Sequence, residues 1–181
     1  MPSLITVEDG TQVAGANAYV SLAELEAYVG TVALPTATDA EYERAIILAT
    51  RYIDGKYRAR LKGQRVAPTT QPLEFPRVGV RLVDGAQEYY GTDPSFYDSQ
   101  YSAYLAIDAI PQEWKDATCE LALRALAAPL AADIAPGDRL TRKKIDVLEW
   151  EYVAGNFQTS YPVVDQLVSR FIRSGSDAVR G

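Results

Sequence analysis

The sequence predicts a mainly α protein, a small bundle of about four helices with a β-hairpin before the last helix and long loops. Four segments repeat apolar residues at helical spacing behind recognisable helix starts, and one later segment alternates apolar and charged residues as a strand does. The length of 181 residues suits one domain with a buried core. We therefore expect a single helical domain over residues 1–173, with an inserted loop at 84–108, and a flexible tail at 174–181.

Capping boxes mark the start of the first two helices. In this motif a Ser or Thr side chain and the side chain of a Glu three residues later each accept a hydrogen bond from the other's backbone N–H. We predict the first helix from about Leu22 to Val29, stopped by Gly30, and the second through about Asp54, stopped by Gly55. The boxes are formed by Ser21 with Glu24 and by Thr38 with Glu41.

Prolines delimit the last two helices. Pro111 is placed at the first helical position, where its missing N–H costs nothing, and Pro129 ends the third helix. The fourth helix begins near Pro162. The section from 63 to 109 contains four prolines, so we expect loop with short extended pieces there. The apolar stripes are Trp114, Ala117, Leu121, Ala125 and Leu126 in the third helix, and Val164, Leu167, Val168, Phe171 and Ile172 in the fourth.

Strict alternation between residues 148 and 152 predicts a half-buried strand, which we expect to pair with residues 141–145 as a hairpin. One face is formed by Leu148, Trp150 and Tyr152, and the other by Glu149 and Glu151. Two carboxylates on one face could hold Mg²⁺ or act as an acid–base pair. No third ligand follows at a recognisable spacing, which favours a polar surface over a metal or catalytic site.

The composition argues against an enzyme. The chain contains no histidine, which removes the commonest general base and the usual zinc ligand, so we expect no catalysis, metal or cofactor. Its net charge of −6 disfavours DNA binding by the whole surface, so any nucleic-acid contact must be local. The single cysteine, Cys119, excludes an internal disulfide and fits a reducing cytoplasm. Neither a signal peptide nor an apolar run of about 20 residues is visible.

A basic segment at residues 56–62 alternates cations with uncharged residues. If it were extended, four cations would lie on one edge about 6.6 Å apart, given roughly 3.3 Å per residue. Such a row could follow a phosphate backbone. The alternatives are a solvated face or pairing with carboxylates of a neighbouring subunit. The candidate nucleic-acid-proximal residues are Lys56, Arg58, Arg60, Lys62 and Arg65.

The stretch 84–108 is rich in tyrosine. Aromatic rings stack on single-stranded bases, so this feature could favour DNA binding. The stretch contains no Lys or Arg and several acidic residues, however, and an acidic surface repels phosphates. We therefore favour contact with protein. The candidate protein-interface residues are Tyr89, Tyr90, Tyr97, Tyr101 and Tyr104, together with Trp150 and Tyr152 of the hairpin.

Several blocks occur along the chain in an order that resembles a known family. They are Thr6-Val7-Glu8-Asp9-Gly10-Thr11, Gly15-Ala16-Asn17-Ala18-Tyr19-Val20-Ser21-Leu22-Ala23-Glu24, Ala49-Thr50-Arg51-Tyr52-Ile53-Asp54-Gly55-Lys56-Tyr57-Arg58, Leu73-Glu74-Phe75-Pro76-Arg77-Val78-Gly79-Val80, Ile110-Pro111-Gln112-Glu113, Lys115-Asp116-Ala117-Thr118-Cys119-Glu120-Leu121-Ala122 and Tyr161-Pro162-Val163-Val164-Asp165. Together they resemble small tailed-phage proteins often labelled DnaT-like, which act as head–tail connectors or head-completion adaptors. Residues 84–108 depart from the pattern that we expect for this family.

The resemblance implies a structural virion protein that is assembled in the host cytoplasm. Neighbouring copies would form a ring, commonly twelve-fold, under the portal protein. The ring would extend the channel for packaged double-stranded DNA and offer a docking platform to the next neck or tail-completion protein, with no membrane involved. The alternative is a DnaT-like replication protein that binds single-stranded DNA, which the separation of cations from tyrosines along the chain disfavours. A carboxylate-based enzyme is the third alternative, which the absence of histidine and of a ligand cluster disfavours.

Overall fold

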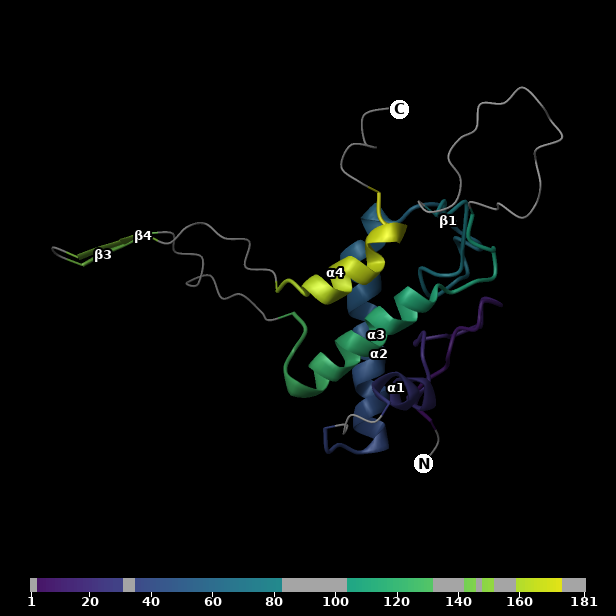
Figure 1. Cartoon of the computed structure of the whole chain (residues 1–181), viewed down its shortest axis with the longest axis horizontal. Helices are drawn as coiled ribbons and strands as arrows, with labels where there is room; N and C mark the ends of the chain where they lie inside the picture. The colour runs from purple at the N-terminus through teal and green to yellow at the C-terminus, as the bar shows by residue number, and fades with distance from the viewer. Residues whose placement is uncertain are drawn as a thin grey trace, which may run out of the picture.

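A computed structural model describes residues 3–30, 35–82, 104–131, 142–145, 148–151 and 159–173. Within these ranges the predicted fold class is confirmed, with four α-helices and a two-stranded antiparallel hairpin before the last helix (Figure 1). The predicted tail at 174–181 lies outside the described residues. The helices are α1 (Leu22–Val29), α2 (Asp39–Tyr57), α3 (Gln112–Ala127) and α4 (Pro162–Val168), with 3₁₀ turns η1 (Arg58–Arg60) and η5 (Ser169–Phe171). The strands are β1 (Gln64–Arg65), β2 (Arg77–Val78), β3 (Arg142–Ile145) and β4 (Leu148–Glu151).

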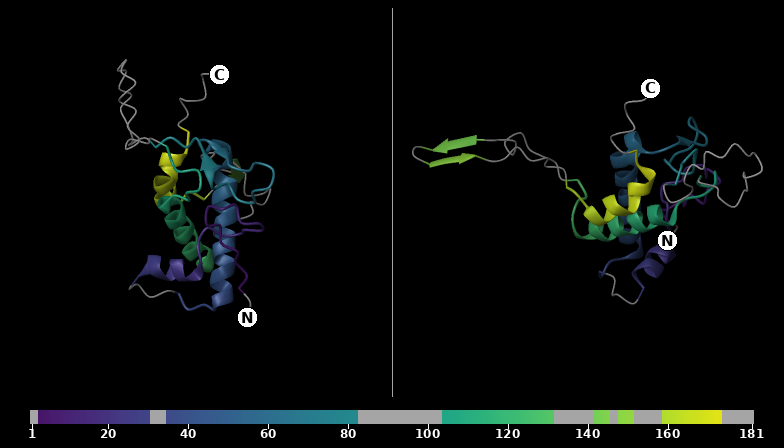
Figure 2. Two further views of the ribbon diagram at one scale, coloured as in Figure 1. Left: turned by 90° about the vertical axis from the view of Figure 1, so that its right-hand side faces the viewer. Right: turned by 45° about the horizontal axis from the view of Figure 1, so that its top comes forward.

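The long helix α2 forms the axis of the body, and α3 packs obliquely across it (Figures 1 and 2). Helix α4 packs on α3, and the short α1 contacts both α2 and α3. Trp114 of α3 is fully buried at the centre of an aromatic cluster. Its indole lies against the rings of Tyr19, Tyr57, Phe75 and Phe171. None of the described helices is both long and apolar enough to cross a membrane.

The predicted starts are confirmed for the first, second and fourth helices. Pro111, expected at the first helical position of the third helix, is instead its N-cap, because its ψ of 139° is extended, and α3 begins at Gln112. Both capping boxes form: the amide of Ser21 donates to Glu24 at 2.7 Å, and the amide of Thr38 donates to Glu41 at the same distance. Helix α1 ends at Val29 as predicted, and α4 begins at Pro162. These features depend on residues within one turn of each other, so local chemistry is enough to determine them.

The predicted stop of the second helix at Gly55 is wrong. Helix α2 continues through this glycine to Tyr57 and then tightens into η1. A glycine inside a helix costs about 1 kcal/mol relative to alanine. Tyr57, two residues later, is fully buried with its ring against Trp114, and its hydroxyl donates to Asp165 of α4. Burial of this aromatic ring outweighs the local preference of glycine.

The predicted hairpin is confirmed, and its register sorts the residues onto two faces. Lys143 pairs with Trp150 and Ile145 with Leu148, which places these four on one face. On the other face Arg142 pairs with Glu151 and Lys144 with Glu149, two opposite-charge positions. Among the elements that the structure describes, the hairpin strands contact only each other, and both figures show them apart from the helical body. From the sequence we expect the face of Leu148, Trp150 and Tyr152 to pack either onto the bundle or onto an adjacent subunit. The described strands make no contact with the bundle, and the second alternative stays a prediction.

Candidate nucleic-acid interface

The basic segment at residues 56–62 is not extended. Lys56 and Tyr57 form the last turn of α2, and residues 58–60 form η1. The interpretation of this segment as a row of cations along one extended edge is therefore wrong, because a 3₁₀ turn brings residues three apart onto one face. The helix continues this far because Tyr57 and Ile53 are buried in the core.

Lys56 joins α2 to α4. Its ammonium group lies 3.0 Å from Oδ1 of Asp165 and 5.0 Å from the centre of the Tyr57 ring. Although burial alone would raise the pKa of Asp165, hydrogen bonds from Tyr57 and Lys56 leave it below its usual value. This cation is paired inside the protein and is a poor candidate for contact with phosphate.

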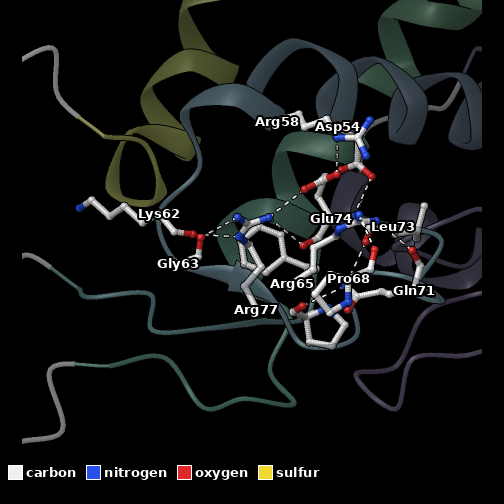
Figure 3. Close-up of polar contacts among 12 residues, drawn as sticks. Asp54, Arg58, Lys62, Gly63, Arg65, Pro68, Gln71, Leu73, Glu74 and Arg77 are labelled. Atoms are coloured by element: carbon white, nitrogen blue, oxygen red, sulfur yellow. Dashed lines mark hydrogen bonds and ion pairs between the residues drawn. The ribbon is translucent and has the colours of Figure 1, made fainter. Parts of the chain in front are cut away.

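Arg58 and Arg77 share the carboxylate of Glu74 (Figure 3). Nε of Arg58 lies 2.9 Å from Oε1 of Glu74, and an Nη of Arg77 lies 2.8 Å from Oε2. The Arg77 guanidinium also donates to the carbonyl oxygens of Lys62 and Gly63, each at 2.8 Å. These contacts tie the loop between β1 and β2 to the end of α2. The side chains of Glu74 and Arg77 are 8% and 7% exposed, whereas that of Arg58 is 64% exposed.

Arg65 also binds within this loop. Its guanidinium donates to the carbonyl oxygens of Gln71 at 3.1 Å and Pro68 at 2.7 Å (Figure 3). Gly63 allows the two strands of the loop to meet: its φ is +65°, and a Cβ there would lie 2.3 Å from the carbonyl oxygen of Val78. The backbone of residues 62–78 is thus held in one shape by its own side chains.

The C-terminal segment after α4 brings further cations to the end of the basic segment. The Lys62 amide donates to the Phe171 carbonyl at 2.8 Å, and the Arg173 amide donates to the Arg60 carbonyl at 2.7 Å. Leu61 and Ile172 form the antiparallel bridge between these contacts. We call residues 60–62 and 171–173 the basic junction; its cations are Arg60, Lys62 and Arg173.

The side chains of Arg60 and Lys62 in the basic junction contact an aromatic ring and a backbone carbonyl. Arg60 lies 5.6 Å from the centre of the Tyr57 ring, and Lys62 donates to the carbonyl oxygen of Arg170 at 2.9 Å. No carboxylate among the described residues forms an ion pair with Arg60, Lys62 or Arg173. Arg60 and Arg173 are also exposed. Three cations on neighbouring segments, without a carboxylate partner in the described part of the chain, make a local positive potential that attracts phosphate, even on an acidic protein.

Sequence reasoning missed a second feature of this region, the close approach of cations to tyrosine rings. Besides Arg60 over Tyr57, the guanidinium of Arg124 in α3 lies 5.7 Å from the centre of the Tyr161 ring at the start of α4. The separation expected from the sequence concerns the tyrosines of 84–108, of which the structure describes only Tyr104, so these contacts, made by other tyrosines, do not test it. Arg124 and Tyr161 are more than 30 residues apart, so no local signal predicts the contact.

Of the predicted protein-interface residues, the structure describes Tyr104 and the strand position of Trp150. Tyr104 is 57% exposed, next to a backbone hydrogen bond from Leu105 to Val80. Trp150 lies in β4, in register with Lys143. The candidates Tyr89, Tyr90, Tyr97, Tyr101 and Tyr152 lie outside the described residues.

The structure also bears on two other kinds of site, a reactive cysteine and a metal-binding cluster. Cys119 is buried in α3, and burial raises the pKa of its thiol to about 12, so it stays protonated and unreactive at neutral pH. Within the described ranges, no three carboxylate or thiol side chains gather as metal ligands would.

Comparison with known proteins gives one match. A family model described as "Putative DnaT-like ssDNA binding protein" covers residues 3–92 and 96–181, and thus omits only residues 93–95 of the stretch 84–108. No curated protein and no solved structure matches. The match confirms the DnaT-like label of the resemblance, and the description names no role in a virion. Because the model spans nearly the whole chain, the protein belongs to the family of putative DnaT-like single-stranded-DNA-binding proteins.

Proposed function

We propose that the protein binds single-stranded DNA through its phosphates at the basic junction. The observation that supports this most directly is the meeting of Arg60, Lys62 and Arg173, which have no carboxylate partner among the described residues. The description of the family points to the same ligand. Because the contacts are to phosphate, binding is independent of base sequence.

The small size of the junction sets the strength of binding. Each phosphate contact to a single strand contributes about 0.7 to the slope of log K against log salt concentration, so three cations give a slope near −2. The net charge of −6 opposes any wider contact. The isolated protein therefore binds weakly at physiological salt and more tightly at low salt.

Neutralising the junction tests this proposal. The double variant Arg60→Gln/Arg173→Gln is expected to weaken binding of labelled oligo-dT about tenfold at low salt and to reduce the salt slope by about 1.4, because two phosphate contacts are lost. Fluorescence anisotropy measures both effects. The matched control is Arg44→Gln/Arg51→Gln, which changes net charge equally at two exposed positions of α2.

The outcomes separate a local site from general charge. An equal loss of affinity in the control pair would mean that net charge, not the junction, decides binding. Tighter binding of a duplex than of oligo-dT would contradict the preference for a single strand. If the wild-type protein showed no detectable binding of oligo-dT at low salt, the proposal would be refuted.

A second candidate function, a head-to-tail adaptor of a virion, is favoured by the hairpin. An isolated two-stranded hairpin is only marginally stable in water, so the face with Ile145, Leu148 and Trp150 calls for a partner. In this role the partners are neighbouring copies in a ring, commonly twelve-fold, the portal protein and the next neck or tail-completion protein. Symmetry then repeats the basic junction into a belt facing packaged double-stranded DNA in the channel of the virion.

The effect of Trp150→Ala tests the role of the hairpin. Because β4 contacts no other described element than β3, the free energy of unfolding of the monomer should change by no more than about 0.5 kcal/mol. Ring formation, or co-sedimentation with purified portal, should be lost. Urea unfolding and sedimentation measure the two effects. Glu151→Ala, on the opposite face of the same strand, is the control that should still assemble.

Two results would contradict the prediction for Trp150→Ala. If the monomer itself lost about 3–5 kcal/mol, Trp150 would be a buried residue of its own bundle. Unchanged assembly of the Trp150→Ala variant would remove the hairpin as support for the adaptor.

A further inference from the structure

We propose that phosphate binding at Arg58 is coupled to proton uptake by the carboxylate pair of Asp54 and Glu74. This inference rests on the proposed DNA binding and adds a dependence on pH to it. Arg58 lies two residues before Arg60 of the basic junction and is exposed like it, so we place a further phosphate contact of the same strand at Arg58. The proton comes from solvent and adds to a carboxylate oxygen.

The pair lies between the end of α2 and the loop before β2 (Figure 3). The Glu74 amide donates to Oδ2 of Asp54 at 3.1 Å, which brings the two acidic residues together. The Glu74 carboxylate contacts Arg58 at 2.9 Å and Arg77 at 2.8 Å. The Asp54 carboxylate has a different environment, because its other hydrogen bond comes from the Tyr19 hydroxyl at 2.8 Å. No cation among the described residues forms an ion pair with Asp54.

This arrangement makes Asp54 the titrating member. Burial raises the pKa of Asp54 to about 7, even though the hydrogen bonds from Tyr19 and the Glu74 amide lower it. Among nearby charges, that of Glu74 raises the pKa further, and that of Arg58 lowers it. The pKa of Tyr19 is raised well above its ordinary value, so its hydroxyl stays protonated and keeps donating.

Arg58 is the member of the cluster that an external anion can reach. Its side chain is 64% exposed, whereas that of Arg77 is 7% exposed and bonded to the loop carbonyls. A phosphate at Arg58 neutralises a positive charge that favours ionised Asp54, and it adds a negative charge nearby. Both effects favour the protonated acid.

Proton binding at Asp54 and phosphate binding at Arg58 strengthen each other. Phosphate binding raises the affinity of Asp54 for its proton, so by reciprocity the proton raises the affinity for phosphate. Near pH 7, where free Asp54 is partly ionised, binding takes up a fraction of a proton. Affinity is therefore highest below pH 6 and falls about three- to tenfold as the pH rises to 8, since a shift of one pH unit in the midpoint corresponds to a factor of ten.

The absence of histidine makes this effect measurable. No other side-chain type in the chain ordinarily titrates near pH 7, which leaves the terminal amine as the only ordinary competitor. In the full chain labelled with ¹³C, the carboxyl signal absent from Asp54→Asn identifies Asp54. We expect its titration midpoint near 7 to move upward in Arg58→Gln and to stay in place in Arg51→Gln, another exposed arginine of the same helical segment. An Asp54 that titrates in the ordinary acid range, or that ignores Arg58→Gln, overturns the inference.

Calorimetry with oligo-dT then tests the coupling itself. Titrations at pH 7 in two buffers of different ionisation enthalpy, at equal ionic strength, should give different binding enthalpies for the wild type and Arg51→Gln. That difference should vanish in Arg58→Gln. Binding with the same enthalpy in both buffers would overturn the coupling and leave the proposed function intact. No binding in either buffer would remove the proposed function and the coupling together.

Discussion

Replacing Trp114 by Ala is expected to lower the free energy of unfolding by about 3–5 kcal/mol, the typical cost of a buried aromatic deletion. The indole is fully buried, and its nearest ring, that of Phe75, lies 4.8 Å away between centroids. The rings around it come from the segment before α1, from α2, from the loop before β2 and from η5. The cavity would therefore loosen contacts between four parts of the chain. Urea unfolding followed by circular dichroism measures the change.

Two controls identify the cause of this loss. The indole Nε1 has no hydrogen-bond partner in the described structure, so Trp114→Phe removes a buried unpaired donor together with some volume and should cost less, about 1–2 kcal/mol. Leu48→Ala, at an exposed position of α2, should change stability by no more than about 0.5 kcal/mol. A Trp114→Ala variant as stable as Leu48→Ala would show that the aromatic cluster is not the core.

Arg77→Leu is expected to lower the free energy of unfolding by a similar amount, about 3–5 kcal/mol. The substitution leaves the buried carboxylate of Glu74 without one of its two cations. The Arg77 guanidinium bonds to the Glu74 carboxylate and to the carbonyl oxygens of Lys62 and Gly63. Its loss would leave all three acceptors short of a donor and would release the loop between β1 and β2. Urea unfolding reports the stability, and amide hydrogen exchange of residues 62–78 reports the loop.

Arg58→Leu is the matched control, since Arg58 bonds to the other oxygen of the same Glu74. Its side chain is mostly exposed, and an exposed ion pair contributes about 0–1 kcal/mol. Equal losses in the two variants would mean that burial does not decide the strength of these ion pairs.

The features that the sequence predicted correctly are those with local causes. The capping boxes at Ser21 and Thr38 each need two residues three apart, and the alternation at 148–151 needs neighbours on one strand. The stop at Gly55 failed because the burial of Tyr57 against α3 outweighs the cost of one glycine. The position of the hairpin apart from the helices also had no local signal, because alternation reports an amphipathic strand but not its partner.

In the candidate site too, some features follow from the sequence alone and others only from packing. By itself the sequence determined that the chain is mainly helical, acidic overall and free of histidine, and that a short segment concentrates its cations. Only the tertiary structure decided which of those cations pair with a carboxylate. The side chains of Lys56 and Arg58 pair with carboxylates from α4 and from the loop before β2, whereas that of Arg60 lies over the Tyr57 ring and that of Lys62 donates to the Arg170 carbonyl. The physical reason is that the charge which a side chain presents to solvent depends on partners more than 15 residues away in the chain, and only packing brings them together.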